Sequence, residues 1–137
     1  MSVLSNLRFL VVDDMLTMRK IISQQLKNLG ALTIVEANDG SVAWEILERE
    51  SKNPNPIQFV VSDWNMPIMK GLDLLKKCRS HANYKDLPFL LVTAEAELAQ
   101  VKEAITAGVD SYVVKPFTPA SFEEKLMAVY NKRFSRK

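Results

Sequence analysis

Residues 57–67 read IQFVVSDWNMP, an apolar run that stops at an acidic residue. Residues 59–61 (FVV) have the composition of a buried strand, and Asp63 follows them closely, beside the large aromatic Trp64. A carboxylate in this place can serve as a turn residue, a metal ligand or a nucleophile. The stretch alone leaves all three interpretations open, and only the rest of the chain can separate them.

Four other short apolar runs have the same character. Most of the five are continuously apolar, which is the pattern of parallel strands covered on both faces. The amphipathic stretches between them repeat at the period of a helix. The runs lie at residues 8–13, 32–37, 58–63, 88–93 and 111–116. This alternation predicts a three-layer α/β fold, a (βα)5 domain with a five-stranded parallel sheet.

The apolar residues of the five amphipathic stretches predict which face of each helix packs inward. Gly30 and Gly108 are predicted helix ends, and Thr118-Pro119 is a predicted helix start. The predicted inward residues are Met18, Ile22, Leu26 and Leu29; Ala43, Ile46 and Leu47; Leu72, Leu75 and Cys78; Leu98, Val101 and Ile105; and Phe122, Leu126 and Val129.

The composition is that of an ordinary globular protein. The chain has 137 residues, 47% hydrophobic and 25% charged, which fits one domain with a sizeable core. A net charge of +2 is too small to indicate a nucleic-acid partner. One cysteine, no run of 18 apolar residues and no signal peptide favour a cytoplasmic location without membrane contact. We therefore expect a single domain over residues 1–137, with its core at about 8–131.

Polar residues gather where the predicted strands end, which is where open α/β sheets bind ligands. Four of the strands end in chemically useful side chains, namely Asp13, Asp14, Asp63, Thr93 and Lys115. Glu36 ends the second strand, and the sequence leaves its direction open. The pattern predicts three carboxylates, one hydroxyl and one ammonium at a single edge of the sheet.

This set of side chains indicates phosphoryl chemistry assisted by a metal. Two carboxylates about 4 Å apart repel each other by about 4 kcal/mol at an effective dielectric near 20. Lys115 supplies one positive charge against this repulsion, and hard oxygen ligands suit Mg2+ as a second. With Mg2+ bound, a carboxylate can attack a phosphoryl group. Lys115 and the Thr93 hydroxyl have the right character to hold the transferred oxygens.

Six motifs resemble, in order and spacing, those of the receiver domains of two-component response regulators. They are VVDDMLTMRKII (11–22), SDWNMP (62–67), GLDLLKKCR (71–79), VTAEA (92–96), AGVDSYVVKPF (107–117) and TPASFEEKL (118–126). The resemblance implies a flavodoxin-like sheet with strand order 2-1-3-4-5. It is greatest to the stand-alone receivers of chemotaxis, through Trp64-Asn65 after the acceptor and Ala94-Glu95 after Thr93.

The resemblance also implies a role for each residue of the site. Asp63 would be the phosphoacceptor, Lys115 would contact the phosphoryl group, and Thr93 would close on it. Asp14 and Asp63 would bind Mg2+ directly, together with the backbone carbonyl of Asn65, and Asp13 would act mainly through ordered water.

Three further implications concern switching and rate, and a fourth concerns the backbone. Ala94 would leave room for the phosphoryl group, and Tyr112 would change its rotamer together with Thr93. Asn65 and Glu95 would tune the rate. The bond before Pro116 is implied to be cis, a state that only an X–Pro bond reaches at low cost.

As a function, the resemblance implies a monomeric switch in chemotaxis signalling that is no enzyme beyond its own Mg2+-dependent phosphorylation and dephosphorylation. Its partners would be a sensor histidine kinase, the flagellar motor switch protein and, additionally, a phosphatase. The motor protein would bind the face of the fourth helix, fifth strand and fifth helix. We expect no separate output domain, because few residues lie outside about 8–131. The alternative is a phosphorelay carrier or phosphate sink that does not act on the motor.

Two other classes fit less well. Phosphatases of the dehalogenase-like superfamily need an acid two residues after the nucleophile, and Asn65 stands there. In a flavin carrier, Asp13 and Asp14 would repel the phosphate unless a metal intervened. Trp64 is interpreted as a partly exposed lid. Residues 131–137 (NKRFSRK) are interpreted as a solvated basic helix end.

Lys70 and the pair Met15-Leu16 depart from the usual receiver pattern near the acceptor.

Overall fold

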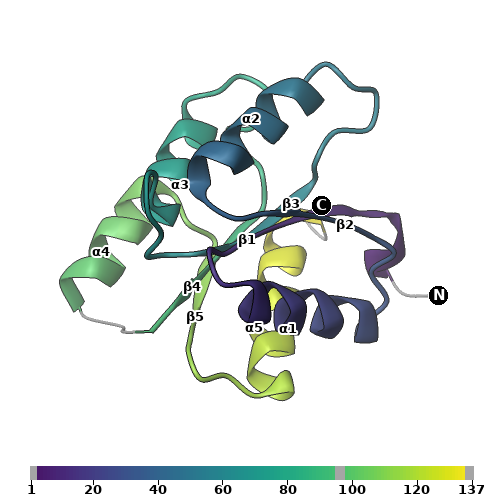
Figure 1. The fold of residues 1–137 in the computed structure, drawn as a ribbon, viewed down its shortest axis with the longest axis vertical. Helices are drawn as coiled ribbons and strands as arrows, with labels where there is room; N and C mark the ends of the chain where they lie inside the picture. The colour runs from purple at the N-terminus through teal and green to yellow at the C-terminus, as the bar shows by residue number, and fades with distance from the viewer. Residues whose placement is uncertain (1–2, 95–97, 135–137) are drawn as a thin grey trace.

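Five parallel strands form one sheet between two layers of helices in the computed structural model, which describes residues 3–94 and 98–134 (Figure 1). The strands are β1 (Arg8–Val12), β2 (Thr33–Ala37), β3 (Phe59–Asp63), β4 (Phe89–Thr93) and β5 (Ser111–Val114). The helices are α1 (Leu16–Asn28), α2 (Gly40–Glu50), α3 (Gly71–Arg79), α4 (Leu98–Ala107) and α5 (Pro119–Phe134), after a short 3-10 turn, η1 (Val3–Asn6). The sheet order β2-β1-β3-β4-β5 confirms the implied topology.

The two faces of the sheet pack against different helices (Figure 1). Successive side chains of a strand point to opposite faces. Leu10 and Val12 therefore pack toward α2, α3 and α4, whereas Phe9 and Val11 pack toward α1 and α5. Burial on both faces explains why the predicted strands are continuously apolar.

Side-chain caps mark the start of two helices. Asp39 precedes α2, and its carboxylate accepts hydrogen bonds from the backbone N–H groups of Ser41 at 2.8 Å and Val42 at 3.0 Å. Thr118 precedes α5 as predicted, and its hydroxyl accepts from the N–H of Ser121 at 3.0 Å. Such caps satisfy N–H groups that have no partner within the helix.

The predicted inner face of α4 is wrong at one position. Ile105 is 61% exposed, and its neighbour Ala104 is buried instead, at 1%. Adjacent helical residues point about 100° apart, so only one of the two can face the core. The side chain of Leu98 is not among those that the structure describes. The predicted inner residues of α2, α3 and α5 are buried as expected.

The basic end of α5 is not simply solvated. Arg133 donates through Nε to the carboxylate of Asp110 at 2.8 Å, and the side chain of Asp110 is fully buried. Arg79, at the end of α3, contacts the other oxygen of the same carboxylate at 3.2 Å. The interpretation of a solvated end is therefore wrong for Arg133, because long-range pairing with Asp110 is invisible in the local sequence.

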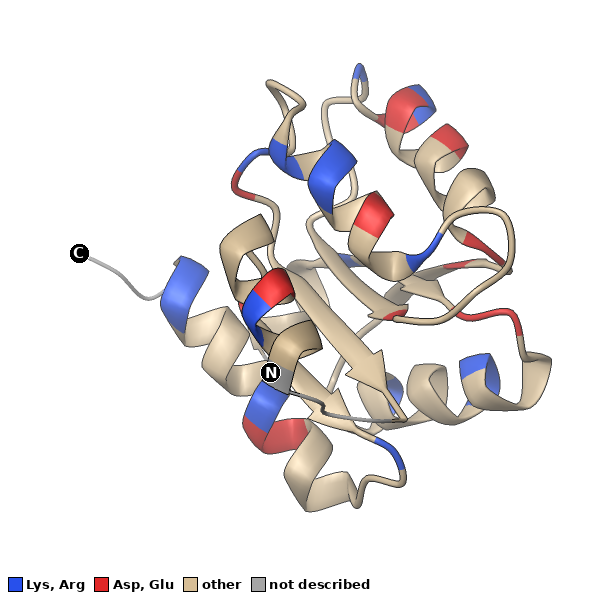
Figure 2. Cartoon of the chain, turned by 90° about the vertical axis from the view of Figure 1, so that its left-hand side faces the viewer, with Lys and Arg blue, Asp and Glu red and all other residues tan. Residues whose placement is uncertain are grey.

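Acidic and basic residues are mixed along α2, α3, α4 and α5, whereas α1 carries basic residues alone (Figure 2). In the described part of the chain, no helix has both the length and the apolar character that a membrane crossing needs.

Candidate functional site

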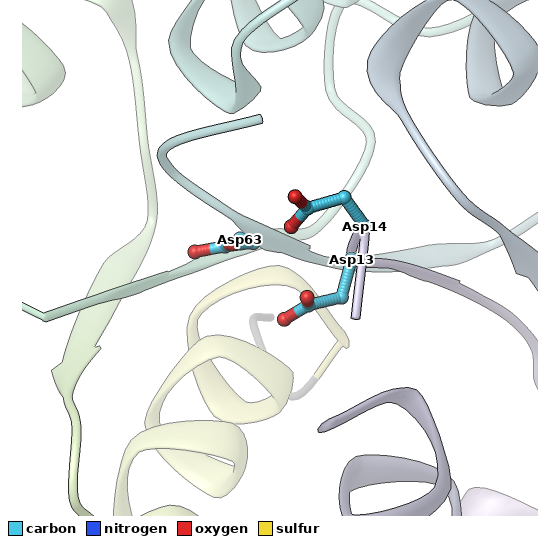
Figure 3. Close-up of side chains that lie close together, drawn as sticks. All are labelled: Asp13, Asp14 and Asp63. Atoms are coloured by element: carbon cyan, nitrogen blue, oxygen red, sulfur yellow. The ribbon is translucent and has the colours of Figure 1, made fainter. Parts of the chain in front are cut away.

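Three carboxylates meet at the carboxyl ends of β1 and β3 (Figure 3). These strands are neighbours, with Val12 paired to Ser62, so Asp13 and Asp63 come to adjacent places at the sheet edge. Oxygen atoms of Asp13, Asp14 and Asp63 lie within 4.8 Å of one another. Asp13 and Asp63 are buried, while Asp14 is exposed. The sequence had predicted this grouping.

Lys115 approaches the carboxylates from the end of β5. Its Nζ lies 3.3 Å from Oδ1 of Asp63 and 3.6 Å from Oδ2 of Asp13. The backbone N–H of Lys115 donates to the Thr93 carbonyl at 2.7 Å, which fixes the chain where β5 ends. The peptide bond from Lys115 to Pro116 is cis, as the resemblance implied. One ammonium thus serves two buried carboxylates.

Burial dominates the electrostatics of this cluster. It raises the pKa of Asp63 above its ordinary value, and the neighbouring Asp13 carboxylate raises it further, while Lys115 opposes both effects. Burial also raises the pKa of Asp13, against the hydrogen bond that its Oδ1 accepts from the Met15 N–H at 2.9 Å. Lys115 therefore does not fully offset the cost of burying these two carboxylates side by side.

The residues fit a hard divalent cation. Among the described residues, Oδ2 of Asp13 is buried and has no hydrogen-bond partner, because Lys115 Nζ at 3.6 Å is too distant. A buried acceptor in this state is costly unless something else satisfies it. Carboxylate oxygens are the donors that Mg2+ prefers, and Asp14 and Asp63 stand next to Asp13. The cluster is thus compatible with a bound Mg2+ ion.

Two of the remaining predicted residues lie on the neighbouring strands. Thr93 ends β4, is 2% exposed and is paired with Val114 of β5. Tyr112 lies on β5, half-buried, with Lys125 Nζ 5.8 Å from the centre of its ring. Ala94 directly follows Thr93 and is exposed.

Glu95, predicted to tune the rate, lies outside the described residues. Asn65 is exposed in the loop after β3.

This arrangement of strands and acidic residues agrees with the comparisons to known proteins. The model of the response regulator receiver domain matches residues 9–127. The chain belongs to the response regulator receiver family. It is 45% identical to the chemotaxis protein CheY-3 of Vibrio cholerae over 93% of this chain and 94% of that protein. It is likewise 45% identical to chemotaxis protein CheY1 of Helicobacter pylori, covering 90% of this chain and 96% of that one.

A solved structure supports the same assignment. Chemotaxis protein CheY4 of Vibrio cholerae superposes with a TM-score of 0.78 at 31% identity, covering 90% of this receiver and 98% of that chain.

Backbone hydrogen bonds hold the loop after β3 in place next to Asp63. The Trp64 N–H donates to the Val92 carbonyl at 2.8 Å, and the Gly71 N–H donates to the Trp64 carbonyl at 2.9 Å. A Cβ at Gly71 would lie 2.1 Å from the carbonyl oxygen of Asp63, so only glycine fits there. Sequence reasoning missed this role of Gly71, whose only signal was its place at a helix start.

The interpretation of Trp64 as a partly exposed lid is wrong. Trp64 is 5% exposed and belongs to the core between the sheet and α2 to α4. Its backbone continues the pairing of β3 with β4 by one residue, and this carries the indole inward. The exposed apolar residue of this loop is instead Ile68, which is 83% exposed and has φ of 69°.

The departures from the usual receiver pattern are all on the surface. Met15 and Leu16, at the start of α1, are 59% and 57% exposed. Lys70 stands at the N-cap of α3 without a side-chain capping bond. These residues alter the surface next to the carboxylates and leave the cluster itself intact.

Proposed function

We propose that this receiver is a phosphorylation switch of chemotaxis that accepts a phosphoryl group on Asp63 from a sensor histidine kinase. The observation that carries the proposal is the position of Asp63, which ends a buried strand 3.3 Å from Lys115 and beside two more carboxylates. The curated relatives at 45% identity are named as chemotaxis proteins, which supports the choice of pathway.

The proposed reaction is a direct transfer. A carboxylate oxygen of Asp63 forms a bond to phosphorus while the P–N bond to the donor imidazole breaks. The imidazole nitrogen keeps the electron pair and takes up a proton. Lys115 offsets charge on the phosphoryl oxygens, and the Thr93 hydroxyl hydrogen-bonds one of them. The small side chain of Ala94 leaves room for the group.

Asp14, Asp63 and the Asn65 carbonyl would hold Mg2+ directly, and Asp13 would hold it through water. When bound, Mg2+ would neutralise charge on the phosphoryl oxygens during the transfer. Oδ2 of Asp13 is buried and has no hydrogen-bond partner among the described residues, which supports this assignment. Asn65 and Glu95 would tune how fast the phosphoryl group is gained and lost.

The output would be a change of surface read by another protein. Tyr112 would change its rotamer when Thr93 closes on the phosphoryl group, and the face of α4, β5 and α5 would then bind the flagellar motor switch protein. A phosphatase would end the signal. The proposal places the protein in the cytoplasm as a monomer, with no catalysis beyond its own phosphorylation and dephosphorylation.

Intact-mass measurement with MgCl2 and acetyl phosphate tests the phosphoryl chemistry. We expect a gain of one base-labile phosphoryl group, and no gain in Asp63→Asn. Equal uptake by both proteins would contradict the acceptor assignment.

A swimming assay tests the output. Deleting the gene and restoring it should change the rotational bias of the flagella. An unchanged rotational bias would contradict the motor role and favour a phosphorelay carrier or phosphate sink.

A further inference from the structure

A polar network joins α1, β2 and the carbonyl group of Asp13. Arg19 donates through Nη1 to the Asp13 carbonyl oxygen at 2.7 Å and through Nε to Oε1 of Glu36 at 3.1 Å. Ser23 donates to the other oxygen of Glu36 at 3.2 Å. The side chain of Glu36 thus points toward α1. It accepts a hydrogen bond from the Arg19 guanidinium, which in turn donates to the Asp13 carbonyl.

The carbonyl that Arg19 binds belongs to the peptide linking Asp13 to Asp14. A peptide group is planar, so a hydrogen bond to its oxygen also fixes the direction in which the backbone continues to Asp14. Two further bonds hold the same residue: its N–H donates to the Ala37 carbonyl at 3.1 Å, and its Oδ1 accepts from Met15 at 2.9 Å. The Arg19 bond adds a third hydrogen bond, to the backbone carbonyl of Asp13.

We propose that Arg19 is a positioning residue, anchored by Glu36, that sets the orientation of Asp13 and Asp14 for divalent-cation binding. This inference rests on the proposed function, because it concerns the same carboxylates. The side chain of Arg19 bonds to the backbone of Asp13 and to Glu36, so it would act on the carboxylates through the backbone. Groups that orient metal ligands in this way commonly account for a 10- to 100-fold effect on affinity.

The chain offers a matched control at the other end of β1. Arg8 pairs with Glu50 and donates to the carbonyl oxygen of Asn55 at 2.6 Å. The side chain of Arg8 is 21% exposed and that of Arg19 is 15% exposed. If Arg19 served stability alone, removing either arginine should have the same consequences.

The test is a titration with MgCl2 that follows the fluorescence of Trp64, next to Asp63. A Trp44→Phe background leaves Trp64 as the single tryptophan, since the chain has two. We expect Arg19→Met to raise the Kd for Mg2+ about tenfold. Arg8→Met should leave that Kd within about twofold, since it touches no group near the carboxylates. Thermal unfolding checks that both variants are folded.

Glu36→Leu provides a second test of the proposal, because it removes the carboxylate that anchors Arg19 and leaves Arg19 itself unchanged. We expect about a threefold rise in the Kd. At saturating Mg2+, phosphoryl uptake from acetyl phosphate by Arg19→Met should recover to near the wild-type rate, because the defect lies in positioning the ligands.

Unchanged Kd values in Arg19→Met and Glu36→Leu would overturn this inference alone. If Arg19→Met does not fold, Glu36→Leu decides. An uptake defect that persists at saturating Mg2+ would also overturn it. Absence of any Mg2+ response in the wild type would overturn the proposed function and this inference together.

Discussion

Lys115 is the single cation that contacts both buried carboxylates in the described part of the chain, at 3.3 Å from Asp63 and 3.6 Å from Asp13. Its ammonium is a compact point charge on a flexible stem, which suits two partners in different directions. Lys115 lies nearer to Asp63 than to Asp13, which fits the proposal that Asp63 is the phosphoacceptor.

Lys115→Arg should retain phosphorylation but switch poorly. Arginine keeps the charge but presents a planar fork, which cannot take the place of one rotatable ammonium. The measurement is the affinity for the motor switch protein with and without a phosphoryl mimic. A gain in affinity as large as that of the wild type would count against a coupling role for Lys115.

Other residues of the site act through geometry that no local pattern reveals. Asp13, Asp14, Asp63 and Lys115 were predictable because parallel strands bring their carboxyl ends to one edge. Arg19 and Gly71 were not, because their roles depend on contacts with the Asp13 and Asp63 carbonyl groups that only the folded chain creates. A glycine or an arginine near a helix start is common in proteins and does not by itself indicate such a contact.

At the scale of single elements, the start of α2 carries a pH-dependent contribution to stability. The hydrogen bonds from Ser41 and Val42 lower the pKa of Asp39 below its ordinary value. The contribution is therefore fully present above the unfolded pKa of about 4 and is lost as the pH falls through the lower, folded value.

Asp39→Ala should lower the free energy of unfolding by about 1 kcal/mol at pH 7. Urea unfolding at pH 7 and at successively lower pH checks this, and the difference from the wild type should shrink in acid. Asp39→Asn is the control, because asparagine caps about as well without a charge. Its stability difference at pH 7 should be small, and a loss as large as that of alanine would contradict the capping role.

The positions of the strands were easier to predict than which face of each helix packs against the core. Each predicted strand contains the observed one, because buried parallel strands are short and continuously apolar. In α4, the greater hydrophobicity of Ile105 suggested that it faces the core, yet Ala104 is the residue buried in the core that α2, α3 and α4 share. The burial of Trp64 followed from a backbone bond between strands, which no period in the sequence records.

Across the whole molecule, a second charged cluster stabilises the edge of the sheet opposite the carboxylates. Asp110 precedes β5, and its buried carboxylate accepts from the Phe89 N–H at 2.9 Å and contacts Arg79 and Arg133. It ties the ends of α3 and α5 to the starts of β4 and β5. The molecule thus has one charged cluster around Asp110 at one edge of the sheet and the cluster of Asp13, Asp14 and Asp63 at the other.

Asp110→Asn should lower the free energy of unfolding by about 3 kcal/mol, because Arg79 and Arg133 lose their shared carboxylate. Asp86→Asn is the control, since Asp86 is 79% exposed and lies 3.7 Å from Arg133, and it should change stability by less than about 1 kcal/mol. Urea unfolding measures both. The Kd for Mg2+ should stay unchanged, and equal stability losses would contradict the distinction between the two pairs.

The most direct test locates the phosphoryl group itself. The phosphorylated protein is treated with borohydride, which reduces an acyl phosphate to an alcohol, and the modified residue is then identified by peptide mass spectrometry. We expect modification at Asp63 and nowhere else. Modification at Asp13, Asp14 or any other carboxylate, with Asp63 intact, would contradict the assignment of Asp63 as the acceptor.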